Sequence, residues 1–401
     1  MTNHTGVFLV VSPIDISSRI LGPSNNEIEF AKAVSVFGKT YLVVGIAAAN
    51  LKSKSTHVIR LLGQFPSNLS VIVLPILARK YLSLIGELLF STEACLVLMF
   101  LHMRFGIRKV IVRGNCEAAI LSFMSHLMGL PLIYRAISTP ISAYELGVFQ
   151  YPKPVQMLLM RVMRFFDLVA LTRADVIFTS SPSAKDLILS EVSVDKEKIV
   201  LMPYFIPDFF FSKRFSEREP LETDLRKIAL TYVGSLNEFY DFDPLISAIW
   251  GLKNLGYKVE LDIYGDGPML ESVSNRAAKL DLQGEIRIHS SIPRKRVPLI
   301  QRSATATLIP YSNRLQRGVS LKSIEAMAMG VPVIVSKRTD SIYVDGENCI
   351  VLQDNSTESW KCAIRDLLNS DLRHKLIVGG FETADMFNRV RLLATLKSQI
   401  A

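Results

Sequence analysis

The sequence is poor in cysteine, and its few cysteines are badly spaced for disulfides or metal. Only four occur in 401 residues, at positions 95, 116, 349 and 362, and no two of them form a Cys-x-x-Cys pair. A disulfide framework or a zinc site needs cysteines or histidines at short, regular spacings. The sequence therefore excludes a small secreted disulfide scaffold. It indicates thiols in a reducing compartment, which we expect to be the cytoplasm.

Long charge-free apolar runs are also scarce. The run 94–103 lies between Glu93 and Arg104 and is far shorter than the roughly 20 residues that a membrane span needs. The longer run 118–134 contains a histidine, a glycine and a proline, which predicts a buried helix, a turn and a strand. No basic residue precedes the first apolar strand, so we expect no signal peptide.

Acidic residues are outnumbered by basic ones. The chain has 46 lysines and arginines against 37 aspartates and glutamates, a formal charge of +9, which favours an anionic partner. Six basic and two acidic residues fall between Arg79 and Arg113. This span fits either a solvated basic face or a surface for an anionic membrane or substrate. Because no known nucleic-acid module is present, we expect no nucleic-acid partner.

The chain is long and apolar enough for two packed domains. Its residues are 49% hydrophobic and 21% charged, which excludes a disordered chain. Short β-branched runs alternate with longer helical ones, as is typical of parallel α/β layers. We predict one Rossmann-like domain over residues 1–205, a linker over 206–226 and a second such domain over 227–385, with a ligand cleft between them. The predicted strands are 7–11, 40–44, 71–74, 109–112, 132–134, 176–179, 229–233, 259–264, 286–288, 306–309 and 332–336.

The most informative stretch runs from 317 to 335. It predicts a loop, a short helix, a helix-ending glycine and a buried strand. The backbone N–H groups of residues 318–321 would be available to a phosphate at the start of this helix. Lys322 and Glu325 share one helix face and suit a nucleotide, the lysine beside the diphosphate and the glutamate accepting hydrogen bonds from ribose hydroxyls. Solvated surface helices commonly carry the same pair.

This stretch resembles the donor-binding element of GT-B glycosyltransferases, specifically the retaining glycosyltransferase family 4, within the glycosyl transferases group 1. Members carry a glycine-rich loop and a helix that begins Lys-x-x-Glu-Ala-Met-Ala, as residues 322–328 do here. Segments 232–236 and 262–268 resemble the family's first C-domain strand and turn and its later Gly-x-Gly-Pro turn. Segments 22–33 and 174–181 resemble the first loop and helix and the last strand of its N-domain. The resemblance covers nearly the whole chain.

The resemblance implies an α/β protein with the GT-B fold, two Rossmann-like domains facing each other. It implies transfer of a sugar, with retention, from a nucleotide diphosphate sugar to a glycan or lipid-linked glycan. It implies no metal and no cofactor. It further implies that no protein base is required, because the leaving diphosphate can itself accept the acceptor's proton. It also implies that the final helix, 386–401, packs back on the N-terminal domain. The expected donor-binding residues are Gly234, Gly265, Gly267, Arg317, Gly318, Val319, Ser320, Leu321, Lys322 and Glu325, the catalytic residues Arg135, Lys322 and Glu325, and the acceptor-binding residues Arg19, Gly22, Pro23 and Ser24.

Several positions depart from the family pattern. Arg317 stands where many members have a first glutamate, Ser235 and Tyr240 stand where an Arg/Lys pair binds the donor diphosphate, and Arg135 stands where a histidine is common. Arg317 fits either of two roles, a phosphate ligand or an ordinary surface arginine. Arg135 also fits either of two roles, a contact to the phosphate or the acceptor, or a structural hydrogen-bond donor. The alternatives are a catalytically reduced homologue that serves as a binding or partner subunit, and a nucleotide-sugar 2-epimerase of the same architecture.

Membrane contact is the last expectation. The predicted helix 155–173 combines a methionine and phenylalanine stripe, which core helices also have, with Arg161 and Arg164. Together with the basic span 79–113, this helix favours a cytoplasmic protein in peripheral contact with anionic lipid on the inner face of the membrane.

Overall fold

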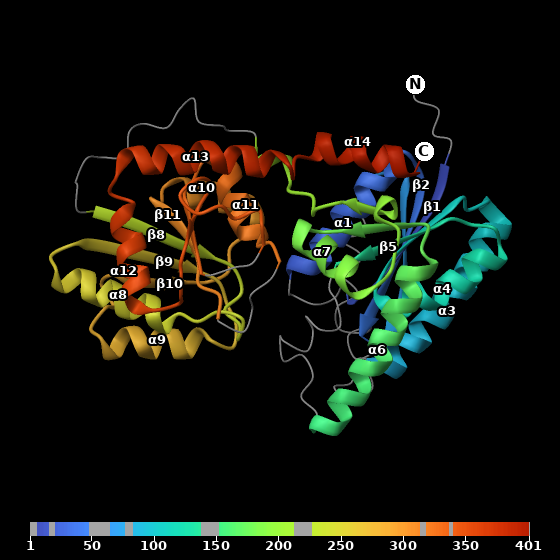
Figure 1. Cartoon of the computed structure of the whole chain (residues 1–401), viewed down its shortest axis with the longest axis horizontal. Coiled ribbons are helices and arrows are strands. Elements are labelled where there is room, and N and C mark those ends of the chain that lie inside the picture. Colours follow the sequence, from blue (N-terminus) through green and yellow to red (C-terminus); the bar gives the residue numbers. More distant parts are fainter. Residues whose placement is uncertain are drawn as a thin grey trace. The chain divides into compact units, whose positions relative to one another are not determined.

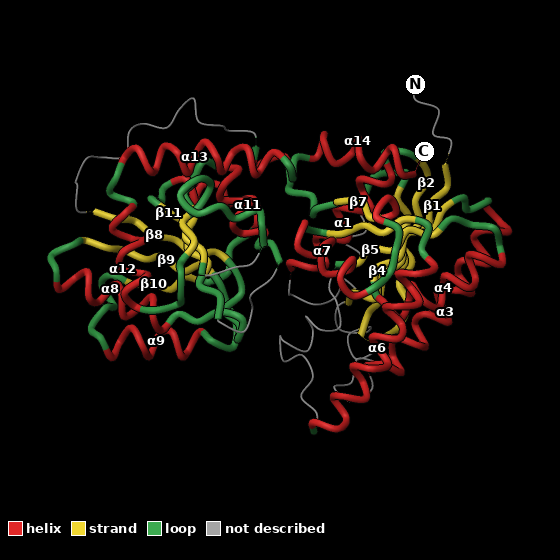
Figure 2. Tube along the Cα trace, in the orientation of Figure 1, coloured by secondary structure: helices red, strands yellow, loops and turns green. Residues whose placement is uncertain are grey.

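The computed structural model describes residues 6–15, 21–47, 65–76, 83–137, 152–211, 227–312, 318–336 and 340–400. The chain forms two compact units, the first made of Met1–Phe205 with Leu392–Ala401 and the second of Ile206–Arg391. Figure 1 labels the elements of both units and Figure 2 colours them by type. Each unit has its own parallel sheet with helices, so the predicted α/β class and Rossmann-like architecture are confirmed.

The first unit contains a seven-stranded parallel sheet in the order β3-β2-β1-β4-β5-β6-β7. The chain starts in the middle of the sheet, moves outward to β3 and then continues on the other side from β4. The order therefore reverses between β1 and β4, and ligands bind at the carboxyl ends of strands beside such a reversal. The strands are β1 (Gly6–Asp15), β2 (Gly38–Ala47), β3 (Leu69–Ile76), β4 (Lys109–Arg113), β5 (Leu132–Ala136), β6 (Val176–Thr179) and β7 (Ile199–Leu201).

Helices cover both faces of this sheet. Alternate residues of β1 point to opposite faces, so Leu9 and Val11 join one buried cluster and Phe8 and Val10 join another. The first cluster includes buried residues of α3, α4 and α6, and the second includes residues of α1 and α14. The helices of this unit are α1 (Leu21–Ser35), α3 (Ser83–Phe105), α4 (Asn115–Leu127), α6 (Lys153–Arg173), α7 (Pro182–Glu191) and α14 (Arg389–Ile400), with a 3₁₀ turn η2 (Lys196–Lys198).

The second unit has a six-stranded parallel sheet in the order β10-β9-β8-β11-β12-β13. Here the order reverses between β8 and β11. The strands are β8 (Lys227–Val233), β9 (Lys258–Tyr264), β10 (Ile286–His289), β11 (Ala306–Ile309), β12 (Val333–Val335) and β13 (Ile350–Val351). The helices are α8 (Asp243–Asn254), α9 (Leu270–Lys279), α10 (Val297–Arg302), α11 (Leu321–Ala328), α12 (Thr357–Asp366) and α13 (Ser370–Asp385), with 3₁₀ turns η3 (Asp208–Phe210) and η4 (Arg294–Arg296).

Two predicted boundaries need correction. Ile206 and Phe210 are buried in the core of the second unit, so the first part of the predicted linker is core, because its aromatic and aliphatic side chains have a sheet to pack on. Residues 212–226 lie outside the described residues. The last helix begins at Arg389, and Phe387 belongs to the second unit's core. Within α14, Leu396 is buried with β1 in the first unit, as the resemblance implies for the terminal helix.

The expectation that no helix would be long and apolar enough to cross a membrane is wrong on length and composition. Within the described part of the chain, Leu84–Phe105 of α3 meets both criteria, and 39% of its most apolar window is buried. The three charged residues of α3 are too widely spaced to interrupt the helix. The sequence reasoning failed because it ended the apolar run at each charge.

Candidate functional site

The helix α11 follows β11 at the point where the strand order of the second sheet reverses. Ser320 stands in extended conformation just before the helix, and Gly318 has φ +89°, which a side chain rarely adopts. The predicted set of available N–H groups is only partly right, because the Ser320 N–H already donates to the Tyr343 hydroxyl at 2.8 Å. This bond and the Ser323 hydroxyl, 2.8 Å from the same Tyr343 oxygen, hold the first turn in place.

Lys322 lies inside a group of aromatic rings. Its Nζ donates to the Tyr240 hydroxyl and lies 4.6 Å from the centroid of that ring and 5.6 Å from that of Tyr232. Burial lowers the pKa of Lys322, although Tyr311 and Glu325 oppose the shift. The alternative that the sequence had left open, a solvated surface lysine, therefore does not fit the structure. A cation held among aromatic rings is well placed to attract a phosphate.

Gly234 makes room for this lysine. It follows β8 with φ +154°, and a Cβ atom at this position would lie 1.8 Å from Lys322 Cε. Gly265 and Gly267, in the turn after β9, have a different reason to be glycine. Cβ atoms there would lie 1.9 Å from the Gly234 oxygen and 2.2 Å from the Leu236 oxygen. The two turns pack backbone against backbone, which explains both glycines without a ligand.

Glu325 is buried, with 8% of its surface exposed, and pairs with Arg294. Arg294 belongs to η4, after β10, and both its Nε and Nη2 donate to Glu325 Oε1. Burial raises the pKa of Glu325, while Arg294 and Lys322 hold it down. Sequence reasoning missed Arg294, although it starts a run of three basic residues after Pro293. Lys322 and Glu325 thus lie near a second cation, Arg294. The turns that follow β8 and its neighbouring strands surround them.

In the first unit, Arg135 ends in a buried ion cluster at the carboxyl edge of the sheet. Its Nη1 lies 2.5 Å from Glu27 Oε2, and Arg113 Nη1 lies 2.7 Å from Glu27 Oε1. The guanidinium also lies 3.6 Å from the centre of the Phe30 ring. Burial lowers the pKa of Arg135, opposed by Glu27. Neither Glu27 nor Arg113 was predicted, and their presence gives Arg135 the structural role that the sequence had left open.

The predicted acceptor residues are only partly described. Arg19 and the predicted donor residue Arg317 lie outside the described residues. Gly22, Pro23 and Ser24 form the first turn of α1, which corrects the expected loop. Proline is compatible with a first helical turn, where its missing N–H has no intrahelical partner. Their binding role stays a prediction.

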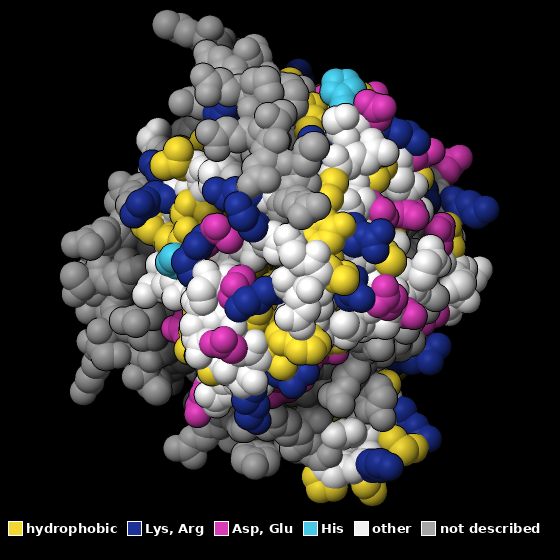
Figure 3. Space-filling view, turned by 90° about the vertical axis from the view of Figure 1, so that its left-hand side faces the viewer, with side chains coloured by type: hydrophobic (Ala, Val, Ile, Leu, Met, Phe, Trp, Pro, Cys, Tyr) yellow, Lys and Arg dark blue, Asp and Glu magenta, His cyan; other side chains and the backbone are white. Residues whose placement is uncertain are grey.

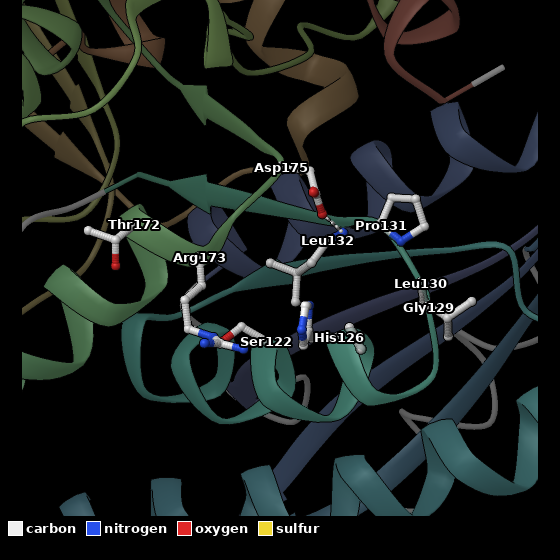
Figure 4. Close-up of a pocket in the computed structure, with 10 residues that line it drawn as sticks. Ser122, His126, Gly129, Leu130, Pro131, Leu132, Thr172, Arg173 and Asp175 are labelled. Carbon is white, nitrogen blue, oxygen red and sulfur yellow. Dashed lines mark hydrogen bonds between the residues drawn. The ribbon is translucent and has the colours of Figure 1, made fainter.

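Two cavities lie away from all of these residues. One, of about 450 Å³, sits where β5 and β6 begin, at the opposite edge of the first sheet, and Figure 4 shows Arg173, Ser122 and Asp175 in its wall. There Arg173 Nε donates to Ser122 Oγ at 3.2 Å and Asp175 accepts from the Leu132 N–H at 2.7 Å. The other lies along α13, lined by Glu347, His374 and neighbouring residues. Among the described residues, no three potential ligands from His, Cys, Asp and Glu gather into a metal site.

Comparison with known proteins identifies the second unit. Residues 213–382 match the family described as glycosyl transferases group 1. The second unit is a group 1 glycosyltransferase domain. This confirms group 1, the broader of the two groupings that residues 317–335 indicated, whereas family 4 within it stays a prediction.

Solved structures extend the likeness to the fold of the whole chain. A sucrose-phosphate synthase from Thermosynechococcus elongatus has a TM-score of 0.71 at 14% identity, over 98% of each chain. A glycosyltransferase from Rickettsia africae has a TM-score of 0.70 at 14% identity, over 98% of this chain and 97% of that one. At such identity the likeness shows the fold alone, and that fold is GT-B.

Curated relatives match over shorter lengths. An uncharacterized glycosyltransferase of Methanocaldococcus jannaschii is 26% identical over 212 residues, 50% of this chain and 51% of the relative. A GDP-mannose-dependent alpha-(1-6)-phosphatidylinositol monomannoside mannosyltransferase of Mycolicibacterium smegmatis is 27% identical over 143 residues, 34% of this chain and 37% of the relative. The matched part thus spans about half or less of the length of these relatives.

Two departures from the group 1 pattern can now be placed. The Ser235 hydroxyl accepts a hydrogen bond from Asn237 at 3.2 Å, and its backbone oxygen accepts one from Tyr232. Tyr240 bonds Lys322, as described above. Where the family pattern expects two cations on this turn, the domain therefore has polar groups, and the described cations of this edge come from α11 and η4.

Proposed function

We propose that the protein is a retaining glycosyltransferase of family 4 that moves a sugar from a nucleotide diphosphate sugar to an acceptor. The observation that carries this proposal is the pair Lys322 and Glu325, set beside Arg294 where the strand order of a group 1 domain reverses. A cation and a carboxylate one helical turn apart match the diphosphate and the ribose of one nucleotide.

In this proposal the donor binds the second unit. Its diphosphate lies near Lys322, the loop from Arg317 to Leu321 and the turn at Gly234, and its ribose hydroxyls donate to Glu325. Arg294 has to share or release Glu325 when the ribose arrives, which frees a guanidinium for the diphosphate. Charge that develops on the leaving diphosphate is stabilised by these cations, so no metal is needed. The leaving group takes the acceptor's proton, and no protein base is required.

The acceptor is assigned to the first unit, at the segment from Arg19 to Ser24. Arg135 is held by Glu27 and is 5% exposed, so we assign it a positioning role. It fixes α1, which carries the acceptor residues, against the carboxyl ends of β4 and β5. Its neutral replacement is expected to raise KM for the acceptor more than it lowers kcat.

A glycan or lipid-linked glycan is the proposed acceptor class. The names of two similar proteins support it. One relative is named for action on phosphatidylinositol monomannoside, and one structural neighbour, with a TM-score of 0.68, is named as a lipopolysaccharide outer core galactosyltransferase. A cytoplasmic enzyme with such an acceptor has to reach the inner face of the membrane, so peripheral contact with anionic lipid belongs to the same proposal.

A thermal-shift screen tests the donor assignment. Some similar proteins are named with UDP and one is named with GDP-mannose, so UDP-, GDP-, ADP- and CMP-sugars are compared. A ligand at 100 times its dissociation constant adds about 2.7 kcal/mol to the stability of the folded state. Stabilisation by one nucleotide class, lost in Glu325→Ala, supports the proposal. Absence of a shift with every donor contradicts it.

A binding or partner subunit is the second candidate. It is favoured by Ser235 and Tyr240, which leave the turn after β8 without the two cations of the family pattern. Such a subunit would bind donor and never hydrolyse it. Slow release of free sugar from the bound donor in the absence of acceptor separates an active transferase from this alternative.

A further inference from the structure

The outer surfaces of α3, α4 and α6 expose an unusual amount of apolar side chain. Of the 21 large hydrophobic residues that are exposed in the described part of the chain, 13 lie on these three helices. The helices lie side by side over one face of the first sheet, as Figures 1 and 2 show. Scattered exposed hydrophobic residues are normal, but their concentration on three neighbouring helices points to an interaction site.

The helix α3 supplies the longest part of this surface. Ile85, Leu89, Leu96, Phe100 and Met103 recur at intervals of three, four and seven residues and are 47–77% exposed. Such intervals place them on one side of the helix. The outward stripe runs the length of α3 and has no role in the core of the unit.

The opposite side of α3 is committed to that core. Phe90, Ala94, Leu98 and Leu101 are at most 2% exposed and belong to the cluster that covers β1, β4 and β5. If α3 crossed a bilayer as a separate span, these side chains and the sheet face beneath them would lose their packing. The apolar outer stripe is therefore suited to lie on a membrane rather than to span it.

On the three helices, basic and acidic side chains differ in exposure to solvent. All five lysines and arginines are exposed, whereas none of the four acidic residues is in the exposed class. Glu117 and Asp167 are buried, and the acidic residues of α3 are half-buried. On the face of the molecule in Figure 3, in contrast, acidic and basic side chains are interspersed. The basic residues are Arg104, Lys153, Arg161, Arg164 and Arg173.

We propose that the surface formed by α3, α4 and α6 docks on an anionic bilayer, with the stripe of α3 and the exposed residues of α6 inserted at the level of the headgroups. An apolar face with an all-basic set of exposed charges fits the boundary between acyl chains and anionic headgroups. A protein partner with an apolar face would match the stripe on α3. It would not explain why all the exposed charges on the three helices are basic.

This inference deepens the proposed function, on which it rests for its purpose, since it names how the protein approaches a lipid-linked acceptor. The N-terminal ends of the three helices lie at the same edge of the sheet as Arg113 and Arg135, because each helix follows a strand in a right-handed parallel crossover. Docking through this surface keeps the acceptor edge of the first unit next to the bilayer.

Vesicle sedimentation with the full chain tests the surface. Vesicles of phosphatidylcholine alone are compared with vesicles that contain phosphatidylglycerol, at low and high salt. Arg161→Gln with Arg164→Gln should weaken binding to the anionic vesicles by about 30-fold at low salt, at roughly 1 kcal/mol for each basic residue. The matched control replaces Lys258 and Lys279, exposed on the second unit, by glutamine and should bind as the unmodified protein does.

The apolar stripe has its own variant. Leu96→Asp with Phe100→Asp should abolish vesicle binding, while Leu299→Asp, at a 72% exposed position of the second unit, should not. Equal binding to both kinds of vesicle, or no binding to either, overturns the proposal. So does a dimer of the full chain that the double aspartate variant dissociates, because the stripe would then be a contact between copies.

Donor titration separates this test from that of the proposed function. Binding to anionic vesicles without binding of any nucleotide sugar would support the docking surface and contradict the proposed function. Binding of donor without binding to vesicles would contradict only the docking surface.

Discussion

The proposed contact between Glu325 and the ribose of the donor allows a test that a simple loss of activity would not provide. Glu325 is buried beside Arg294 and Lys322, so a ribose hydroxyl would reach it in a site with little water. A hydrogen bond to such a charged group contributes about 1.5–3 kcal/mol. Replacing Glu325 by alanine should therefore weaken nucleotide binding by about 10- to 150-fold. The fold should survive, because the Arg294 side chain left behind is 25% exposed and can turn to water.

Calorimetric titrations with a nucleoside diphosphate and its 2′,3′-dideoxy analogue complete a thermodynamic cycle. If the carboxylate accepts from the ribose, the alanine variant loses affinity for the natural nucleotide and almost none for the dideoxy analogue. Equal losses with both ligands would refute the contact and with it the placement of the donor. Glu358→Ala, at an exposed ion pair on α12, is the matched control and should leave both affinities unchanged.

Three further predictions follow from other parts of the fold. Gly234→Ala should displace Lys322, whose Cε would lie 1.8 Å from the new Cβ, and weaken diphosphate binding in titrations, while Gly284→Ala, with open space around it, should not. Burial raises the pKa of Glu87 to about 7, so the folded state binds a proton that the unfolded state has lost, and stability should fall as pH rises from about 4.5 through 7. Glu87→Gln should flatten this fall when the free energy of unfolding is measured in urea at several pH values, and an unchanged pH dependence would contradict the raised pKa of Glu87. Deleting 392–401 removes three buried apolar side chains of the first unit and should destabilise that unit by several kcal/mol. The melting temperature should fall while donor affinity is retained. A loss of donor affinity instead would assign α14 to the second unit.

Elements with strong local signals were predictable from the sequence. The short helix predicted before Gly330 corresponds to α11, and the predicted strand 332–336 corresponds to β12 within one residue at each end, because Gly330 and Pro332 mark the turn between them. The start of α1 was not predictable by the same rules. Gly22 and Pro23 favour a loop in isolation, yet both fit a first helical turn, where no intrahelical N–H bond is needed.

The ion-pair partners in both units depend on which strands become neighbours in the fold, which local sequence patterns do not show. Arg294 lies 31 residues from Glu325, and Glu27 lies 86 and 108 residues from its two arginines. No periodicity or motif links positions so far apart, because the pairing arises only when the strands that carry them become neighbours. A buried carboxylate nevertheless has to be paired. Glu27 lies in the segment 22–33 that resembles the family's first loop and helix. It was therefore a cue that the arginines directly after the predicted strands 109–112 and 132–134 have a common buried partner.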